Sequence, residues 1–382
     1  MIDRMQAGEV PAKPHVAFRS PTGALRHEEC FTRQGFDGEF SILYHEGPPM
    51  TDRAIGPAAP GPWDRKVPEY GEEQPLRRRL LLGERAAAGW TPVCGNADVV
   101  VSLFELPVEA GSAFANGDGD DLHYLFSGRA TLETPFGDLD VEGGDYVLVP
   151  RSVVHRWRVV EPLSGIAFEL RGGLHLPTQY RNPVGQLRMD APYTHRDFRR
   201  PVFRGPREGP DSILVKKGDR FVRREPLVSP FDVVGWDGTV WPFAFPILSF
   251  QPKTGLVHLP PTIHATFAGR GALVCSFVPR MTDFHPDAIP CPYPHSSVDC
   301  DEVLYYVRGS FTSRRGVGPK AVSLHPAGIP HGPHPGAYEG SIGTRSTDEL
   351  AVMLDTFLPL RVTTQARELE LASYHDSWAP AP

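Results

Sequence analysis

Short apolar runs, each closed by glycine, proline or a charged residue, recur along most of the chain. Runs of this length, rich in β-branched and aromatic residues, predict strands rather than helices. A first region from about residue 98 to 170 contains the candidates Val99–Leu106, His123–Phe126, Ala130–Glu133, Tyr146–Pro150 and Gly165–Leu170. A second such region runs from about 243 to 363. The best helix candidate is the C-terminal segment from Arg367 to Trp378.

The two β regions form a diverged repeat. In both, an acidic residue stands seven positions before a glycine and a histidine closes the copy: Asp121, Gly128 and His155 in the first, Glu302, Gly309 and His331 in the second. Proline-closed strands followed by a histidine, present twice, are similar to the cupin superfamily of jelly rolls. We therefore predict an all-β bicupin, with two double-stranded β-helix (jelly-roll) domains and short peripheral helices. The expected limits are residues 1–175 for the N-terminal domain, 176–240 for a linker and 241–382 for a metal-binding C-terminal domain.

Composition supports this fold class and narrows the partners. The 41 prolines and 38 glycines are typical of an all-β chain with many turns. The formal net charge of -7 argues against binding to nucleic acid or to an anionic membrane. Five cysteines without a CxxC pair, and no apolar leader, favour a reducing cytoplasm. We expect a cytoplasmic protein that forms a homo-oligomer.

The residues that could bind a metal lie in the second copy of the repeat. His295 and Glu302 flank the start of the apolar run Val303–Val307, and His331 follows a Pro-Ala-Gly-Ile-Pro turn. Two imidazoles and one carboxylate on one face of an ion are the ligand set of non-haem iron(II) oxygenases, which leaves positions open for substrate and dioxygen. Mn, Ni or Zn would suit the same donors. Asp299 and Asp301 compete with Glu302 for the carboxylate position.

The first copy lacks one of these ligands, because Phe114 stands where the second copy has His295. We predict that this copy is a metal-free scaffold. The alternative is a second metal at Asp121, His123 and His155.

Three motifs in the C-terminal half, VHLPPTIHATF, PYPHSSVDCDEVLYYVRG and LHPAGIPHGPHPG, resemble homogentisate 1,2-dioxygenases, particularly a short bacterial branch. The resemblance implies an Fe(2+)-dependent, extradiol-type enzyme that opens the ring of homogentisate with O2 to give maleylacetoacetate, in tyrosine and phenylalanine catabolism. It implies that the iron ligands are His295, Glu302 and His331, that the catalytic acid/base is His258, and that Tyr293, His325 and His331 contact the substrate.

His264 competes with His258 for the acid/base role, since both flank the same Leu-Pro-Pro-Thr-Ile loop. His258 follows the strand-like run 255–257, so we expect it at the end of a strand, and we expect His264 at the barrel rim. A strand end holds a catalytic group more rigidly than a turn does, which favours His258.

The chain also departs from the better-known family members. It has one extra residue between the first histidine and the glutamate, Ser296 and Ser297 in place of an arginine, and Phe311 in place of a tyrosine. These positions are expected to touch the substrate. The sequence therefore does not decide which aromatic ring is cleaved. Alternatives are another cupin ring dioxygenase (gentisate or hydroxyanthranilate type, or a biosynthetic tailoring oxygenase) and a non-catalytic ligand-binding bicupin.

Overall fold

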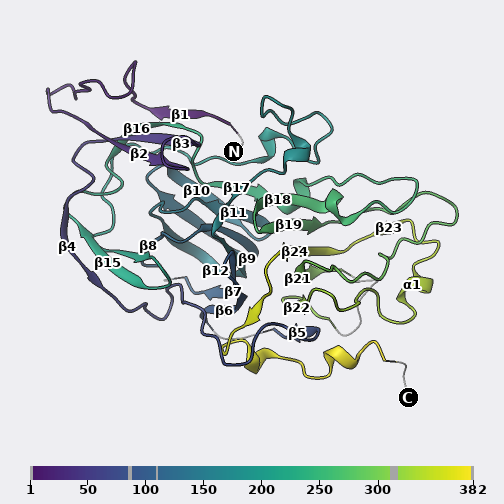
Figure 1. Cartoon of the computed structure of the whole chain (residues 1–382). Helices are drawn as coiled ribbons and strands as arrows, with labels where there is room; N and C mark the ends of the chain where they lie inside the picture. The colour runs from purple at the N-terminus through teal and green to yellow at the C-terminus, as the bar shows by residue number, and fades with distance from the viewer. Residues whose placement is uncertain (1–2, 85–87, 109–110, 310–316, 380–382) are drawn as a thin grey trace.

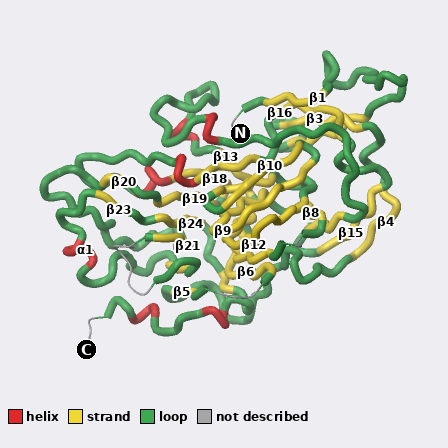
Figure 2. Tube along the Cα trace, turned by 180° about the vertical axis from the view of Figure 1, so that it is seen from behind, coloured by secondary structure: helices red, strands yellow, loops and turns green. Residues whose placement is uncertain are grey.

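The computed structural model describes residues 3–84, 88–108, 111–309 and 317–379, and its architecture is almost entirely β (Figure 1). Within these residues there is one α-helix, α1 (Ala337–Gly340), together with short 3-10 turns (Figure 2). Two strand-built bodies lie side by side, and a four-stranded sheet packs at the N-terminal end. The predicted all-β bicupin fold is confirmed. No helix in the described part of the chain is long and apolar enough to cross a membrane.

The N-terminal barrel is built on a sheet in the order β17-β11-β9-β12-β7-β6-β25, with β10 paired to β9. Its strands are β6 (Gly89–Gly95), β7 (Val99–Leu106), β9 (Asp120–Thr134), β10 (Gly137–Glu142), β11 (Asp145–Val149), β12 (Arg156–Leu170), β17 (Phe243–Pro246) and β25 (Arg361–Val362). A second sheet, ordered β4-β15-β14-β8, contains β4 (Asp52–Pro57), β8 (Ala113–Asn116), β14 (Ile213–Lys216) and β15 (Phe221–Pro226). The sheet at the N-terminal end, ordered β1-β16-β3-β2, contains β1 (Met5–Gly8), β2 (His27–Thr32), β3 (Phe40–His45) and β16 (Val233–Gly238).

The C-terminal barrel is built on a sheet in the order β13-β18-β19-β24-β21-β22-β5. Its strands are β5 (Leu80–Leu82), β13 (Gly172–His175), β18 (Ala265–Arg270), β19 (Ala272–Phe277), β21 (Asp301–Arg308), β22 (Val322–His325) and β24 (Leu350–Thr356). A two-stranded ribbon, β20 (Arg280–Met281) with β23 (Ser346–Thr347), stands beside it.

Burial along β12 shows how the sequence places the core. In its first part Trp157 and Val159 are buried while Arg158 and Val160 are exposed, the alternation expected of a strand with one face in water. From Leu163 to Leu170 every residue is buried, because this part of the strand is covered on both faces.

Strands far apart in sequence join the two barrels. β5 pairs with β22 of the C-terminal barrel, whereas β17 and β25 pair with β11 and β6 of the N-terminal one. Side chains continue the connection, since the Tyr146 hydroxyl lies 2.8 Å from that of Ser276. One apolar core therefore runs through both barrels. The domain limits given above stay a prediction.

The expected C-terminal helix is wrong. Residues 367–378 form two 3-10 turns, η5 (Arg367–Leu369) and η6 (Tyr374–Asp376). Besides the bonds of these short turns, the backbone here bonds to β5 and the residue after it: Gly83 donates to the carbonyl of Leu369, and Leu371 donates to that of Leu81. Burial of Tyr374 against His325 fixes the tail in this path. Long-range pairing thus overrides the local helical preference.

His45 joins two carboxylates in the N-terminal sheet. Its ring contacts Asp232 through Nδ1 and Glu29 through Nε2, and the side chain is buried. Burial alone would lower the pKa of His45, but the hydrogen bonds with the two carboxylates raise it to about 9. The folded chain therefore favours the protonated imidazole.

We expect His45→Gln to destabilise the protein more at about pH 6 than at about pH 10. The unfolded imidazole titrates near 6.5, so the stabilisation is complete below that pH and disappears as the pH rises through about 9. The full effect is of the order of 3 kcal/mol. Urea unfolding of both proteins at the two pH values measures it. Equal differences in unfolding free energy at both pH values would contradict the charged contact.

Candidate metal centre

His295, Glu302 and His331 converge at the mouth of the C-terminal barrel, with one donor atom of each within 4.8 Å of the others. His295 and His331 face each other in a two-residue bridge, in which each backbone N–H donates to the other's carbonyl at 2.8 Å. Glu302 comes from β21, and its carboxylate oxygens lie 3.8 Å from Nε2 of His295 and 3.7 Å from Nε2 of His331. The three predicted ligands are therefore brought together.

Both imidazoles are oriented by their own loops. Nδ1 of His295 lies 3.1 Å from the carbonyl of Tyr293, and Nδ1 of His331 lies 2.9 Å from that of Ile329. A carbonyl accepts only from a protonated nitrogen, so both rings carry the proton on Nδ1 and turn the lone pair of Nε2 toward Glu302. Metal-binding histidines are held in this way. The donor set fits a divalent ion.

His325 supports the carboxylate from within the barrel. Its Nδ1 lies 2.6 Å from Oε1 of Glu302, its Nε2 lies 3.3 Å from the hydroxyl of Tyr374, and the ring is fully buried. Burial would raise the pKa of Glu302, but its contacts with the imidazoles of His295, His325 and His331 hold it well below its ordinary value. Glu302 is therefore an anion ready to bind a cation. The substrate contact predicted for His325 stays a prediction, since the described cavity wall does not include this residue.

The rival carboxylates have other positions. Asp301 precedes Glu302 on β21, so its side chain points to the opposite face. It accepts hydrogen bonds from the backbone N–H of Ala327 at 2.7 Å and of Leu360 at 2.6 Å. Asp299 is exposed. The geometry favours Glu302 as the carboxylate ligand.

The site opens into a cavity of about 800 Å³, counted with its mouth to solvent. Apolar side chains make much of its wall, among them Pro261, Phe277, Leu304 and Met353. The polar groups beside the ligands are His258, His264, Arg280 and Glu349. Tyr293 is half-exposed and packs edge-on against His258, with ring centroids 5.3 Å apart. Phe311 lies outside the described residues.

The two acid/base candidates differ in their surroundings. The expected strand before His258 is wrong, because residues 251–260 form a loop; Nδ1 of His258 lies 3.5 Å from a carboxylate oxygen of Asp283. His264 is not at an exposed rim: it ends the 3-10 turn η4 (Pro261–His264) and is buried. Burial, with the nearby Arg280, lowers its pKa well below the ordinary value. His264 is thus a weak base, and only His258 has a carboxylate to stabilise its protonated form.

The N-terminal barrel repeats the backbone bridge and the buried acid of the metal centre, but an arginine lies beside its acid. Phe114 and His155 form the same bridge as His295 and His331, which supports the repeat alignment. Here, however, the guanidinium of Arg65 pairs with Asp121 in the barrel interior and stacks on Trp90. Burial and Arg65 lower the pKa of His123 to about 3. An arginine stands where the alternative prediction would require a second metal.

A third acidic group, Asp118, Glu169 and Asp219, is also close enough to hold an ion. Nζ of Lys216 already lies within 3.0 Å of a carboxylate oxygen of each. The ammonium already lies at the centre of this cluster, and the guanidinium of Arg171 pairs with Glu169 and Asp219, so the cluster is not a candidate metal site.

Sequence reasoning missed Arg280, Asp283 and Tyr374. The first two belong to the segment after β19, which has no periodic pattern, and the third lies in the supposed helix. Only their contacts in the folded structure show that they belong to the site.

Fold and donor set together define a bicupin with a two-histidine, one-carboxylate site. Residues 86–247 match the model of the homogentisate 1,2-dioxygenase N-terminal region. A candidate dioxygenase of Saccharolobus solfataricus is 34% identical over 387 residues, covering 99% of both chains. The chain belongs to the homogentisate 1,2-dioxygenase family.

Two further comparisons give lower similarity. The homogentisate 1,2-dioxygenase of Bradyrhizobium diazoefficiens is 28% identical over 283 residues, which are 69% of this chain and 62% of that protein. Among solved structures, a cupin barrel protein of Leptotrichia buccalis is 10% identical, with a TM-score of 0.33 over 72% of this chain and 91% of that one.

We expect Glu302→Ala and His331→Ala to lose the metal while the protein stays folded. Removing one of three protein ligands weakens binding strongly, whereas the barrel core is built from apolar strands. Metal analysis after dialysis should give about one equivalent for the wild type and far less for the variants. Asp299→Ala, at an exposed position, is the matched control. Full metal content in Glu302→Ala would remove this residue from the ligand set.

Proposed function

We propose that this protein is an Fe(2+)-dependent dioxygenase that opens the ring of homogentisate or of a closely related dihydroxylated aromatic acid. The observation that carries the proposal is the convergence of His295, Glu302 and His331, two of which, His295 and Glu302, line a cavity with an apolar wall. Family membership supports a dioxygenase. The particular acid, the product maleylacetoacetate and a place in tyrosine and phenylalanine catabolism are part of the proposal, as are a cytoplasmic location and a homo-oligomer.

Iron held by these three residues would supply the redox chemistry that activates dioxygen and would polarise a bound phenol. His295 and His331 present their Nε2 atoms to this position, and the buried, anionic Glu302 balances the charge. The proposed fit rests on this donor set. Manganese or another divalent ion remains the alternative that metal analysis distinguishes.

The protein's own groups bind and orient the substrate. Phe277, Leu304 and Met353 offer an apolar surface to the ring and exclude water from it. His258 lies in the same cavity, within reach of a substrate hydroxyl, and Asp283 can stabilise the imidazolium that forms when Nε2 accepts the phenolic proton. This proton then has to return to the product or leave through the exposed side of His258.

A second candidate is another cupin ring dioxygenase, because Ser296 and Ser297 stand where better-known family members have an arginine. A non-catalytic bicupin is less well supported, since such a protein has no use for three converging ligands. The deciding experiment is oxygen uptake after anaerobic loading with ferrous iron, with homogentisate, gentisate and 3-hydroxyanthranilate compared. The proposal expects the fastest uptake with homogentisate. Uptake with none of the three would contradict it.

We expect His258→Asn to keep its iron and bind substrate but to turn over about 10²–10⁴-fold more slowly, the usual contribution of a positioned acid/base. His264→Asn should lose less, because its buried imidazole is a weak base. Rates for both variants in one oxygen-uptake series, with iron content measured on the same samples, test the assignment. A larger loss for His264→Asn would transfer the role to His264.

A further inference from the structure

Arg280 is the one arginine in the described wall of the cavity that contains His295 and Glu302. It begins β20, whose pairing with β23 fixes the backbone at the edge of the cavity. Its side chain is partly buried. The only hydrogen bond seen for its guanidinium within the described residues is a long one, 3.4 Å, to the carbonyl of Val278.

Within the described residues this guanidinium has no ion pair, unlike those of Arg65 and Arg171. Arg65 is paired with Asp121, and Arg171 with Asp219 and Glu169. In the described structure no carboxylate lies within 4 Å of Arg280. Burial lowers its pKa, and the more distant Glu349 and Asp283 only partly compensate. Withdrawing a cation from water without a partner is costly, so a partly buried guanidinium of this kind is expected where an anionic ligand completes it.

We propose that Arg280 binds the carboxylate of the substrate and so selects aromatic acids over neutral phenols. The inference rests on the proposed function and goes further by naming the group that recognises the acid. A guanidinium binds a carboxylate through two parallel N–H···O bonds, which set the orientation of the substrate ring and also contribute affinity. The ring then lies on the apolar wall of the cavity, between Arg280 and the ligand set.

Glu349 lines the same cavity and acts against an anion. Glu349 gives a second test, because removing its charge and removing the charge of Arg280 should change the affinity for an acid in opposite directions. Removal of the positive charge at Arg280 should weaken binding of an acid. Removal of the negative charge at Glu349 should strengthen it, and neither change should affect a neutral analogue much.

The test is anaerobic calorimetry on the iron-loaded protein, with 2,5-dihydroxyphenylacetate and its neutral amide as probes. Both probes offer the same hydroxyls to the metal, so the ratio of their dissociation constants isolates the carboxylate. We expect the wild type to prefer the acid by about 10- to 100-fold, the range for a hydrogen bond to a charged group. Arg280→Gln should bring the ratio close to one, Arg280→Lys should keep part of it, and Glu349→Gln should increase it.

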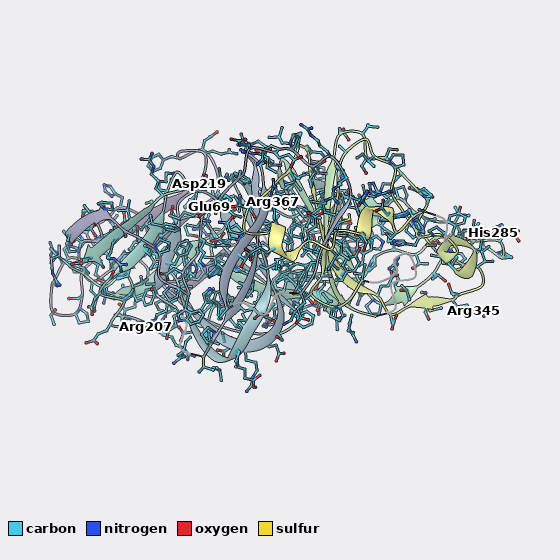
Figure 3. All side chains as sticks on the ribbon, turned by 90° about the horizontal axis from the view of Figure 1, so that it is seen from below. Glu69, Arg207, Asp219, His285, Arg345 and Arg367 are labelled. Carbon is cyan, nitrogen blue, oxygen red and sulfur yellow. The ribbon has the colours of Figure 1, made fainter. Side chains whose placement is uncertain are left out.

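Arg345→Gln is the matched control, because Arg345 is exposed at the outer end of the molecule, where His285 also lies (Figure 3). Its ratio should equal that of the wild type. Thermal melting and iron content of each variant show whether it is folded and loaded; if Arg280→Gln fails either check, Arg280→Lys and Glu349→Gln decide. A wild type without preference for the acid, or a preference that survives in Arg280→Gln, would overturn the proposal. The binding measurement needs no turnover. Absence of oxygen uptake would therefore contradict the proposed function without deciding whether Arg280 binds the carboxylate.

Discussion

The backbone bridge between His295 and His331 is the contact on which the candidate metal centre depends. Two hydrogen bonds of 2.8 Å clamp the segment before β21 to the segment after β22, and the ligand imidazoles leave the chain at the clamped residues. Asp301 reinforces the clamp by accepting bonds from Ala327 and Leu360, just beyond the strands. Rigid backbone therefore sets the separation of the donors before any ion binds, which is the preorganisation a metal site needs.

The N-terminal barrel builds the same frame around an arginine. It retains the bridge, through Phe114 and His155, and Asp120 occupies the position of Asp301, accepting bonds from the backbone of Arg151 and Leu174. The two barrels differ in the groups that lie beside the buried carboxylate. In one barrel the guanidinium of Arg65 meets Asp121, and in the other the carboxylate of Glu302 faces two imidazoles. A buried anion is costly without a positive partner. Arg65 supplies that partner to Asp121, and a metal ion bound by His295 and His331 would supply it to Glu302.

The cavity combines these ligands with groups from a segment that belongs to neither long strand set. Arg280 and Asp283 follow β19 closely, and the His258 loop packs against them. Glu302 thus comes from a paired strand and the two histidines from the bridge beside it, whereas His258 and Asp283 come from loops. This division is usual in enzymes, since loops can change substrate contacts without disturbing the frame.

The sequence by itself determined the strand framework and the ligand candidates. Val99–Leu106 was recognisable because apolar strand residues have a local pattern, and β7 has these limits. Gly128, within β9, and Gly309, just after β21, stand at equivalent positions of the repeat. Their φ values are 96° and 100°, and a Cβ at either position would come too close to a backbone carbonyl oxygen. Repeat spacing then aligned Glu302 with Asp121, a relation that survives in the structure because both copies pair their strands alike.

Only the tertiary structure decided which neighbours these residues meet. Asp301 and Glu302 are adjacent in sequence, and their roles separate only when β21 presents opposite faces to different partners. Arg65 lies more than fifty positions before Asp121, and no local pattern announces their contact. Segment 367–378 had a helical composition but pairs with β5. In each case the deciding energy is a hydrogen bond or ion pair between distant parts of the chain, which local periodicity does not encode.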